Sequence, residues 1–138
     1  MLTCDSVNVD PASGKHFIFG HFSSIKVKAF PAVQPTLTLF VGMNDLAAGE
    51  HNLELKFGNP SATPPPPPKK KFPWDPAPPA FDPMQSLLKQ KLNSTGPEQR
   101  VYFISELKEL TFDVASNYKL LLLVDGQPLG DVSLSVAS

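Results

Sequence analysis

The sequence predicts an all-β protein built as a single antiparallel sandwich of two sheets, immunoglobulin-like or C2-like, with about seven strands and one short helix. Within short segments in both halves of the chain, apolar residues alternate with polar residues at a period of two. Clusters of turn-forming residues separate these segments at close intervals. The chain has 138 residues, and without its proline-rich stretch it matches the roughly 100 that one such sandwich needs. We therefore expect one domain over residues 1–138.

The first part of the chain predicts a hairpin. Its strands are expected at Leu2 to Val9 and at His16 to Val27, joined by the turn formers from Asp10 to Lys15. The apolar parity changes between Cys4 and Val7, which indicates a bulge or a strand that contributes to two sheets. Three aromatic side chains of the second strand are expected to supply much of the core: Phe17, Phe19 and Phe22.

Four further strands are predicted on the two sides of the proline-rich stretch. Apolar and polar side chains alternate over residues 36–43 and again over residues 52–57, as in a strand with one solvent face. The β pattern resumes at residues 101–104 and at residues 110–114. These segments are expected to form the middle of the sandwich.

The C-terminal region predicts a second hairpin. Its strands are expected at Tyr118 to Val124 and at Leu129 to Val136, on either side of Asp125 and Gly126. Both turn residues tolerate a positive φ, which favours a tight two-residue turn. Leu120 to Val124 is apolar on both faces, as is typical of a central strand that is covered on both sides.

One short helix is predicted over residues 83–92. The segment is rich in strong helix formers, with Asp82 as an N-cap and Pro83 at the first helical position. Its apolar residues fall at helical spacing and are expected to dock on the body of the domain. They are Met84, Leu87, Leu88 and Leu92.

The most unusual feature is a proline-rich excursion over residues 59–83. Five consecutive prolines, Pro64 to Pro68, restrict φ and remove backbone donors, which predicts a polyproline II rod. Pro64, Pro67 and Lys69 match a Pro-x-x-Pro core followed by a basic residue, a pattern that docks on aromatic-lined grooves. The residues of a candidate protein-interaction site are Pro64, Pro67, Lys69, Lys70, Lys71, Phe72 and Trp74.

Two interpretations of the excursion stay open at this point. In the first, it is a stiff spacer whose far end is pinned to the domain by Phe72, Trp74 and Phe81. In the second, it docks on a partner, and Trp74 is an exposed hot spot beside the lysine triplet. The exposure of the Trp74 ring distinguishes the two.

No residue pattern predicts catalysis, a metal or a cofactor. The histidines are His16, His21 and His51, and their spacing does not place them together on one strand face. Cys4 lies in an apolar strand, and no Gly-x-Ser-x-Gly motif or phosphate-binding glycine loop is present. Asp125 is explained by its turn. We therefore expect a protein that is not an enzyme.

Composition excludes two classes of partner. The net charge is −1, so general affinity for nucleic acid is not expected. No apolar run approaches the roughly 20 residues of a membrane-spanning helix. The N-terminus shows no signal-peptide pattern, and a lone cysteine, Cys4, fits a reducing compartment. These observations predict a cytoplasmic protein.

Several turn and strand motifs at both ends carry a resemblance to a known family. They are Val7-Asn8-Val9-Asp10, Gly14-Lys15, Phe17 to Phe22 with Ser23-Ser24-Ile25, Gly49-Glu50-His51, and Tyr118-Lys119 to Asp125 through Gly130. In the order of these motifs along the sequence, the chain resembles a family of small uncharacterised bacterial proteins. That family is classed as a domain of unknown function with a β-sandwich fold. Similar proteins cross the middle with a short loop, so residues 59–97 depart from the pattern. The resemblance implies a fold and no site residues.

These observations predict a non-enzymatic interaction or assembly module. The partner is either an unknown protein or a second copy of the chain. One alternative is a structural subunit of a homo-oligomer or a phage-like particle, in which sheet edges or the excursion pack against neighbours. Another is a small-molecule or sugar binder in which Trp74, Tyr102 and Tyr118 stack on the ligand.

Overall fold

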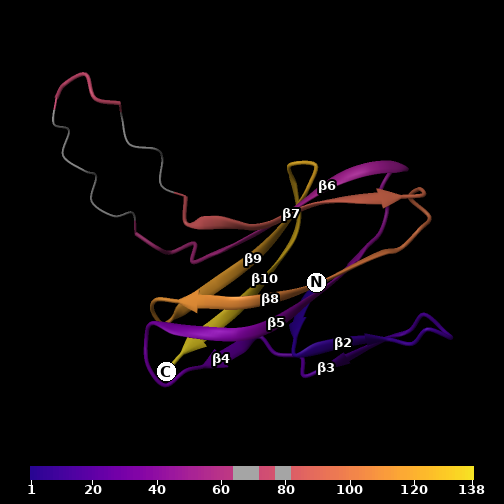
Figure 1. Ribbon diagram of the computed structural model, residues 1–138, viewed down its shortest axis with the longest axis horizontal. Coiled ribbons are helices and arrows are strands. Elements are labelled where there is room, and N and C mark those ends of the chain that lie inside the picture. Colours follow the sequence, from indigo (N-terminus) through magenta and orange to yellow (C-terminus); the bar gives the residue numbers. More distant parts are fainter. Residues whose placement is uncertain (64–71, 77–81) are drawn as a thin grey trace.

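The computed structural model describes residues 1–63, 72–76 and 82–138, and within these residues it is all-β, with no helix (Figure 1). The chain forms ten strands in the described residues. They are β1 (Leu2–Cys4), β2 (Ser6–Val9), β3 (His16–Phe19), β4 (Ser24–Lys26), β5 (Ala32–Met43), β6 (Gly49–Gly58), β7 (Met84–Ser94), β8 (Val101–Phe112), β9 (Ser116–Val124) and β10 (Gln127–Ala137).

The strands form three sheets. A five-stranded sheet has the order β4-β10-β9-β6-β7, a three-stranded sheet has the order β1-β5-β8, and β2 and β3 form a separate ribbon. All pairs are antiparallel except β4 with β10, which is parallel. The all-β, sandwich-like class is therefore confirmed. The expected helix, the two-sheet plan with about seven strands and the purely antiparallel pairing are wrong.

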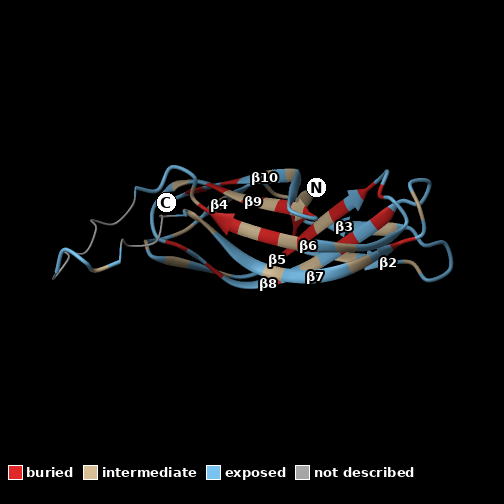
Figure 2. Cartoon of the chain, turned by 90° about the horizontal axis from the view of Figure 1, so that it is seen from above, coloured by how far each residue is buried: buried red, intermediate tan, exposed pale blue. Residues whose placement is uncertain are grey.

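The core lies between the five-stranded and the three-stranded sheet, where buried residues mostly alternate with more exposed ones (Figure 2). The run from Leu37 to Leu39 in β5 is an exception, because all three residues are buried. The strand period of two explains this alternation. At one end, Tyr118 stacks on Phe57 at 5.7 Å between ring centroids and meets Phe112 edge-on at 4.9 Å. The buried Tyr118 hydroxyl donates to the Val114 carbonyl at 2.8 Å, so this polar atom keeps a partner inside the core.

The predicted helix over residues 83–92 is strand β7 instead. Strand β7 pairs with β6, and its first residue, Met84, lies opposite Gly58, the last residue of β6. Asp82 does accept a hydrogen bond from the Met84 amide at 2.9 Å, as an N-cap would, but the chain then continues extended. An isolated helix of about ten residues is marginal in water. Pairing with the edge of β6 therefore overrides the local preference.

The aromatic residues of the β2–β3 ribbon do not form the core expected from the sequence. Phe17 and Phe19 are 50% and 49% exposed, and only Phe22 of the three packs partly against the core. The predicted strand from His16 to Val27 is divided into β3 and β4. The expected parity change near Cys4 is confirmed as a change of sheet, because β1 joins the three-stranded sheet and β2 joins the ribbon.

The second hairpin is confirmed. Asp125 and Gly126 connect β9 to β10 with φ values of 51° and 79°, as a two-residue turn with two positive φ angles requires. Strand β9 is central, with β10 and β6 on its two sides. Its inward residues are buried, whereas Leu121 and Leu123 on the other face are only half-buried. The face turned away from the core is thus less covered than the sequence suggests.

Candidate interaction site

A short turn presents the aromatic residues of the proline-rich excursion. The Asp75 amide donates to the Phe72 carbonyl at 3.1 Å, which closes a four-residue turn with Pro73 in its second position. The Asp75 carboxylate accepts a second hydrogen bond from the Phe72 amide at 2.9 Å. Two hydrogen bonds and a proline therefore hold this turn locally.

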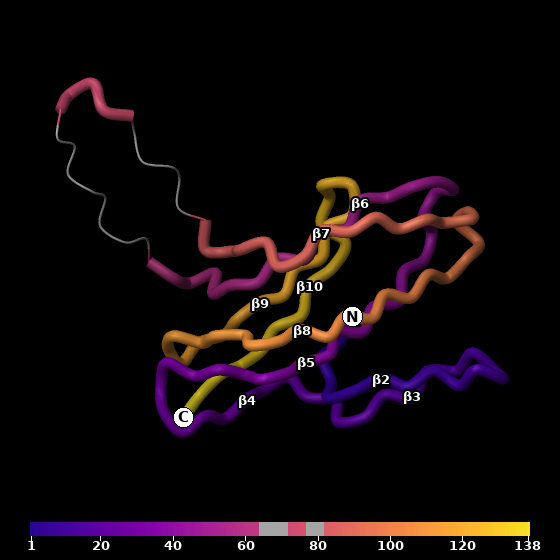
Figure 3. Tube along the Cα trace, in the orientation of Figure 1, coloured from indigo at the N-terminus to yellow at the C-terminus, as the bar shows by residue number. Residues whose placement is uncertain are grey.

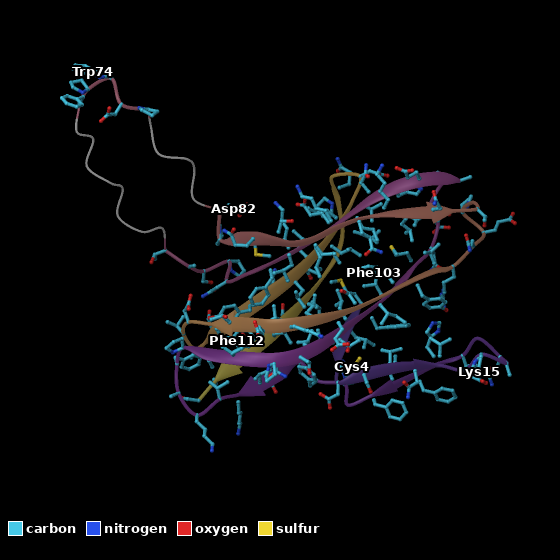
Figure 4. All side chains as sticks on the ribbon, viewed as in Figure 1. Cys4, Lys15, Trp74, Asp82, Phe103 and Phe112 are labelled. Carbon is cyan, nitrogen blue, oxygen red and sulfur yellow. The ribbon has the colours of Figure 1, made fainter. Side chains whose placement is uncertain are left out.

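The turn stacks two aromatic rings. The Phe72 and Trp74 rings lie 4.9 Å apart between centroids with an interplanar angle of 8°. Trp74 is 77% exposed and Phe72 is 43% exposed. Figure 4 shows Trp74 at the far end of the excursion, pointing away from the sheets. Most of the indole surface is therefore open to solvent.

The other candidate interaction residues lie outside the described residues. These are Pro64, Pro67, Lys69, Lys70 and Lys71. Phe81, which the spacer interpretation requires, also lies outside the described residues. The structure brings together Phe72 and Trp74 from the candidate set. The polyproline II rod expected from Pro64 to Pro68 also falls outside the described residues.

The described parts of the excursion leave and rejoin the domain at a cleft of about 530 Å³. Its lining includes Gly58, Asn59, Ser61, Ala62, Thr63, Asp82, Pro83 and Gln85. The Asn59 side-chain oxygen accepts from the Ser61 amide at 3.0 Å and from the Ser116 hydroxyl at 3.1 Å. A Cβ on Gly58 would overlap the Pro83 carbonyl oxygen, so the two arms meet too closely for a side chain there. The Asn59 side chain thus ties the outgoing arm to Ser116 at the start of β9.

The three aromatic residues proposed for sugar stacking do not share a site. Tyr118 is 4% exposed and packs inside the core. Tyr102 lies on the outer face of the three-stranded sheet, where its ring contacts His16 at 4.2 Å between centroids. Trp74 stacks on Phe72. Tyr118 borders the cleft at the base of the excursion, but neither Tyr102 nor Trp74 lines that cleft.

Sequence reasoning missed a histidine–carboxylate pair. His51 Nδ1 lies 2.6 Å from Asp125 Oδ2, and its Nε2 lies 2.7 Å from the Ala47 carbonyl. The other Asp125 oxygen accepts from the Asn52 amide at 2.8 Å. The pairing of β6 with β9, which places Leu53 opposite Val124, brings these distant residues together. No local pattern could have predicted it, since 74 positions separate them.

Both nitrogens of His51 face acceptors, which favours the doubly protonated ring. The Ala47 carbonyl, and then Asp125, raise the pKa of His51 above its ordinary 6.5. The Asn52 amide, and then His51, lower the pKa of Asp125 below its ordinary 3.8. An imidazole that donates from both nitrogens has no free lone pair, so in this arrangement His51 does not serve as a general base.

The pH range in which this pair stabilises the fold follows from the two shifts. The contribution of His51 is complete below pH 6.5 and is lost as the pH rises through its raised pKa. The contribution of Asp125 is complete above pH 3.8 and is lost as the pH falls through its lowered pKa. The pair therefore stabilises the folded protein most between these two values.

The remaining reactive groups form no metal or nucleophile site in the described residues. No three His, Cys, Asp or Glu side chains of this part of the chain lie close enough to hold a metal ion. Cys4 is fully buried, and this burial, followed by the charge of Asp5, raises the pKa of its thiol. The reactive thiolate is thus disfavoured.

The fold and the exposed turn define a sandwich-like β domain that carries the turn of residues 72–75 between β6 and β7. The sequence model of a family described as "Family of unknown function (DUF6941)" matches residues 1–137, so the chain belongs to this family. The expected membership in an uncharacterised family is confirmed, and the match also spans the middle that the end motifs left uncovered. The chain matches no curated protein and no solved structure. The described residues contain no helix with the length and apolarity to cross a membrane.

Proposed function

We propose that this protein is a non-enzymatic interaction module that presents Phe72 and Trp74 to a protein partner. The observation that carries the proposal is the exposed stack in its closed turn: 77% of Trp74 is open to solvent while its ring lies on Phe72. An indole pinned to the sandwich would favour a spacer. An indole displayed in a preformed turn favours docking.

The turn has the physical properties of a binding hot spot. Trp is enriched among residues that dominate binding energy, because it buries a large area with only two side-chain torsions to fix. Burying its exposed surface in a partner is worth roughly 2 to 4 kcal/mol. The turn's hydrogen bonds and the Phe72 stack hold the ring before binding, which lowers the entropy cost of association.

The sequence beside the turn indicates the kind of partner. Lys69, Lys70 and Lys71 directly precede Phe72. A partner with an apolar pocket for the indole and acidic side chains around it would satisfy both features, since charge around a hot spot directs encounter and specificity. The resemblance to bacterial proteins and the lone cysteine support the bacterial cytoplasm as the setting of this role.

The test compares partner capture from native lysate by the intact protein and by variants. Because Gly58 pairs with Met84, deleting residues 60–83 would leave too short a connection. Residues 64–81 are therefore replaced by a Gly/Ser linker, and Trp74→Ala is prepared separately. Val33→Ser is the matched control, since Val33 is an exposed apolar residue on β5.

We expect both excursion variants to lose the same captured proteins, and Val33→Ser to retain them. Binding of the purified partner should weaken by roughly 30-fold or more for Trp74→Ala, the effect of a hot-spot residue. Equal capture by the intact protein and both excursion variants would contradict the proposal.

A further inference from the structure

His51 joins two connections that lie at the first end of strand β6. Its Nδ1 lies 2.6 Å from Asp125 Oδ2 in the turn between β9 and β10, and its Nε2 lies 2.7 Å from the Ala47 carbonyl oxygen in the loop between β5 and β6. Figure 3 shows that turn beside β6. The His51 side chain is only 12% exposed, so the two protein acceptors enclose the ring.

The turn side of this junction is fixed independently of His51. The Asp125 amide donates to the Asn52 carbonyl at 2.8 Å, and the Asn52 amide donates to Asp125 Oδ1 at 2.8 Å. Both bonds join the turn to β6, and neither uses the imidazole. A change in the protonation of His51 therefore leaves the Asp125 carboxylate in place.

The loop side is held more weakly, at a corner formed by Ala47 and Ala48. Just before the corner, Leu46 is buried and its carbonyl accepts a hydrogen bond from the Ser94 hydroxyl at 3.2 Å. Both alanines of the corner are exposed. Within the described part of the chain, His51 is the only side chain that bonds to the corner. The corner can therefore move without uncovering the core.

The two acceptors make different demands on the ring. Only a doubly protonated imidazole donates to both, because a neutral one carries one N–H and one lone pair. When His51 loses a proton to water, the charged Asp125 carboxylate, the stronger acceptor, retains the remaining proton on Nδ1. The Nε2 lone pair then faces the Ala47 carbonyl oxygen 2.7 Å away. That contact changes from a hydrogen bond to a repulsion.

The other charges around this junction leave the pair intact. Glu50 points to the opposite side of β6 from His51, because neighbours in a strand alternate, and it pairs with Lys91 of β7 at 3.0 Å. Among the described residues, Asp125 is the only charged group that bonds to the ring. The charged residues of the elements around the junction, besides Asp125, are Asp45, Glu50, Lys91, Glu98 and Arg100.

We propose that His51 is a pH-sensitive latch on the loop between β5 and β6. The doubly protonated ring holds the Ala47–Ala48 corner near the β9–β10 turn, and the neutral ring keeps its proton on Nδ1 and releases the corner. This device is separate from the Trp74 turn.

The pH range of the latch follows from its contacts. The Ala47 carbonyl, and then Asp125, raise the pKa of His51 above its ordinary 6.5. The latch is therefore closed below pH 6.5 and opens as the pH rises through the raised pKa.

The experiment follows the intact protein by NMR between about pH 5 and about pH 9, on both sides of the ordinary histidine value. Imidazole nitrogen shifts report the protonation and tautomer of His51, and backbone relaxation reports the order of the corner. We expect the backbone order parameters of Ala47 and Ala48 to fall from about 0.85 to below about 0.6, with the same midpoint as His51. The neutral ring should carry its proton on Nδ1, and the Asn52 amide should stay protected.

Asp125→Asn provides the sharpest comparison. While its side-chain oxygen accepts from the Asn52 amide, its NH₂ group donates to Nδ1 of neutral His51, which moves the ring proton to Nε2 and preserves the bond to Ala47. The turn itself is kept, because asparagine also tolerates a positive φ. The corner should therefore stay ordered over the whole pH range in this variant.

Two further variants complete the test. His51→Gln should abolish the pH response of the corner, and His21→Gln, at an exposed histidine elsewhere, should leave it unchanged. Circular dichroism establishes that each variant folds, and Asp125→Asn retains the imidazole should His51→Gln not fold. A corner that stays ordered while wild-type His51 becomes neutral would overturn the proposal. A neutral wild-type ring protonated on Nε2, or a pH response that persists in Asp125→Asn, would overturn it equally.

Discussion

Gly58 is the position at which the base of the excursion is most sensitive to a single methyl group. It ends β6 opposite Met84. A Cβ there would overlap the Pro83 carbonyl oxygen and lie 2.8 Å from the Pro83 carbonyl carbon and 3.0 Å from the Met84 Cα. All three atoms belong to the backbone of the returning arm. The arm cannot avoid the methyl group by changing a rotamer, so it must move away from β6.

The expected cost of Gly58→Ala follows from these contacts. Overpacking costs about 1–3 kcal/mol, and loss of the last β6–β7 hydrogen bond adds about 1 kcal/mol. Against this, alanine restricts the unfolded chain and stabilises by about 0.4–1 kcal/mol. We therefore expect Gly58→Ala to lower the free energy of unfolding by about 1–3 kcal/mol, measured by urea titration followed by circular dichroism.

Gly42→Ala provides the matched control. A Cβ at Gly42 would lie 3.5 Å from a ring carbon of Tyr102, which is an ordinary van der Waals contact. Only the effect on the unfolded chain remains, so this variant should be neutral or more stable by up to about 1 kcal/mol. If Gly58→Ala were as stable as Gly42→Ala, the close approach of the two arms would be refuted.

Three other measurements test the core and the histidine pair. The stability advantage of wild type over His51→Gln should be largest between pH 3.8 and 6.5 and should shrink at higher pH, as the raised pKa of His51 and the lowered pKa of Asp125 require. An advantage that does not change with pH would contradict the pair. Phe112→Ala should cost about 3–5 kcal/mol in the same urea assay, because Phe112 is fully buried; a cost under about 1 kcal/mol would contradict its place in the core. Tyr118→Phe should cost about 1–2 kcal/mol through the lost bond to the Val114 carbonyl, and an unchanged midpoint would show that this bond contributes nothing.

Local residue patterns predicted the parts of the fold that depend on local chemistry. Asp125 and Gly126 predicted the C-terminal turn because few residues tolerate two successive positive φ angles. Alternation over residues 36–43 and 52–57 predicted β5 and β6, since a strand with one buried face must alternate. The sequence also indicates that the environment of Trp74 distinguishes docking from spacing.

Long-range pairing decided what local patterns could not. Residues 83–92 carry helical spacing and a capping aspartate, yet the edge of β6 makes them strand β7. Phe17 and Phe19 look like core residues in the sequence, but their strand pairs only with β2 and leaves one face uncovered. His51 meets Asp125 only because β6 and β9 are neighbours.

The sequence by itself determined the all-β class, the C-terminal turn and the position of the excursion, because strand period, turn chemistry and proline restriction act over a few neighbouring residues. The tertiary structure alone decided which sheet each strand joins, which phenylalanines remain exposed, and how Gly58 meets Pro83. These outcomes depend on hydrogen bonding and packing between segments far apart in the chain. A strand's own residues do not specify which neighbour will cover them.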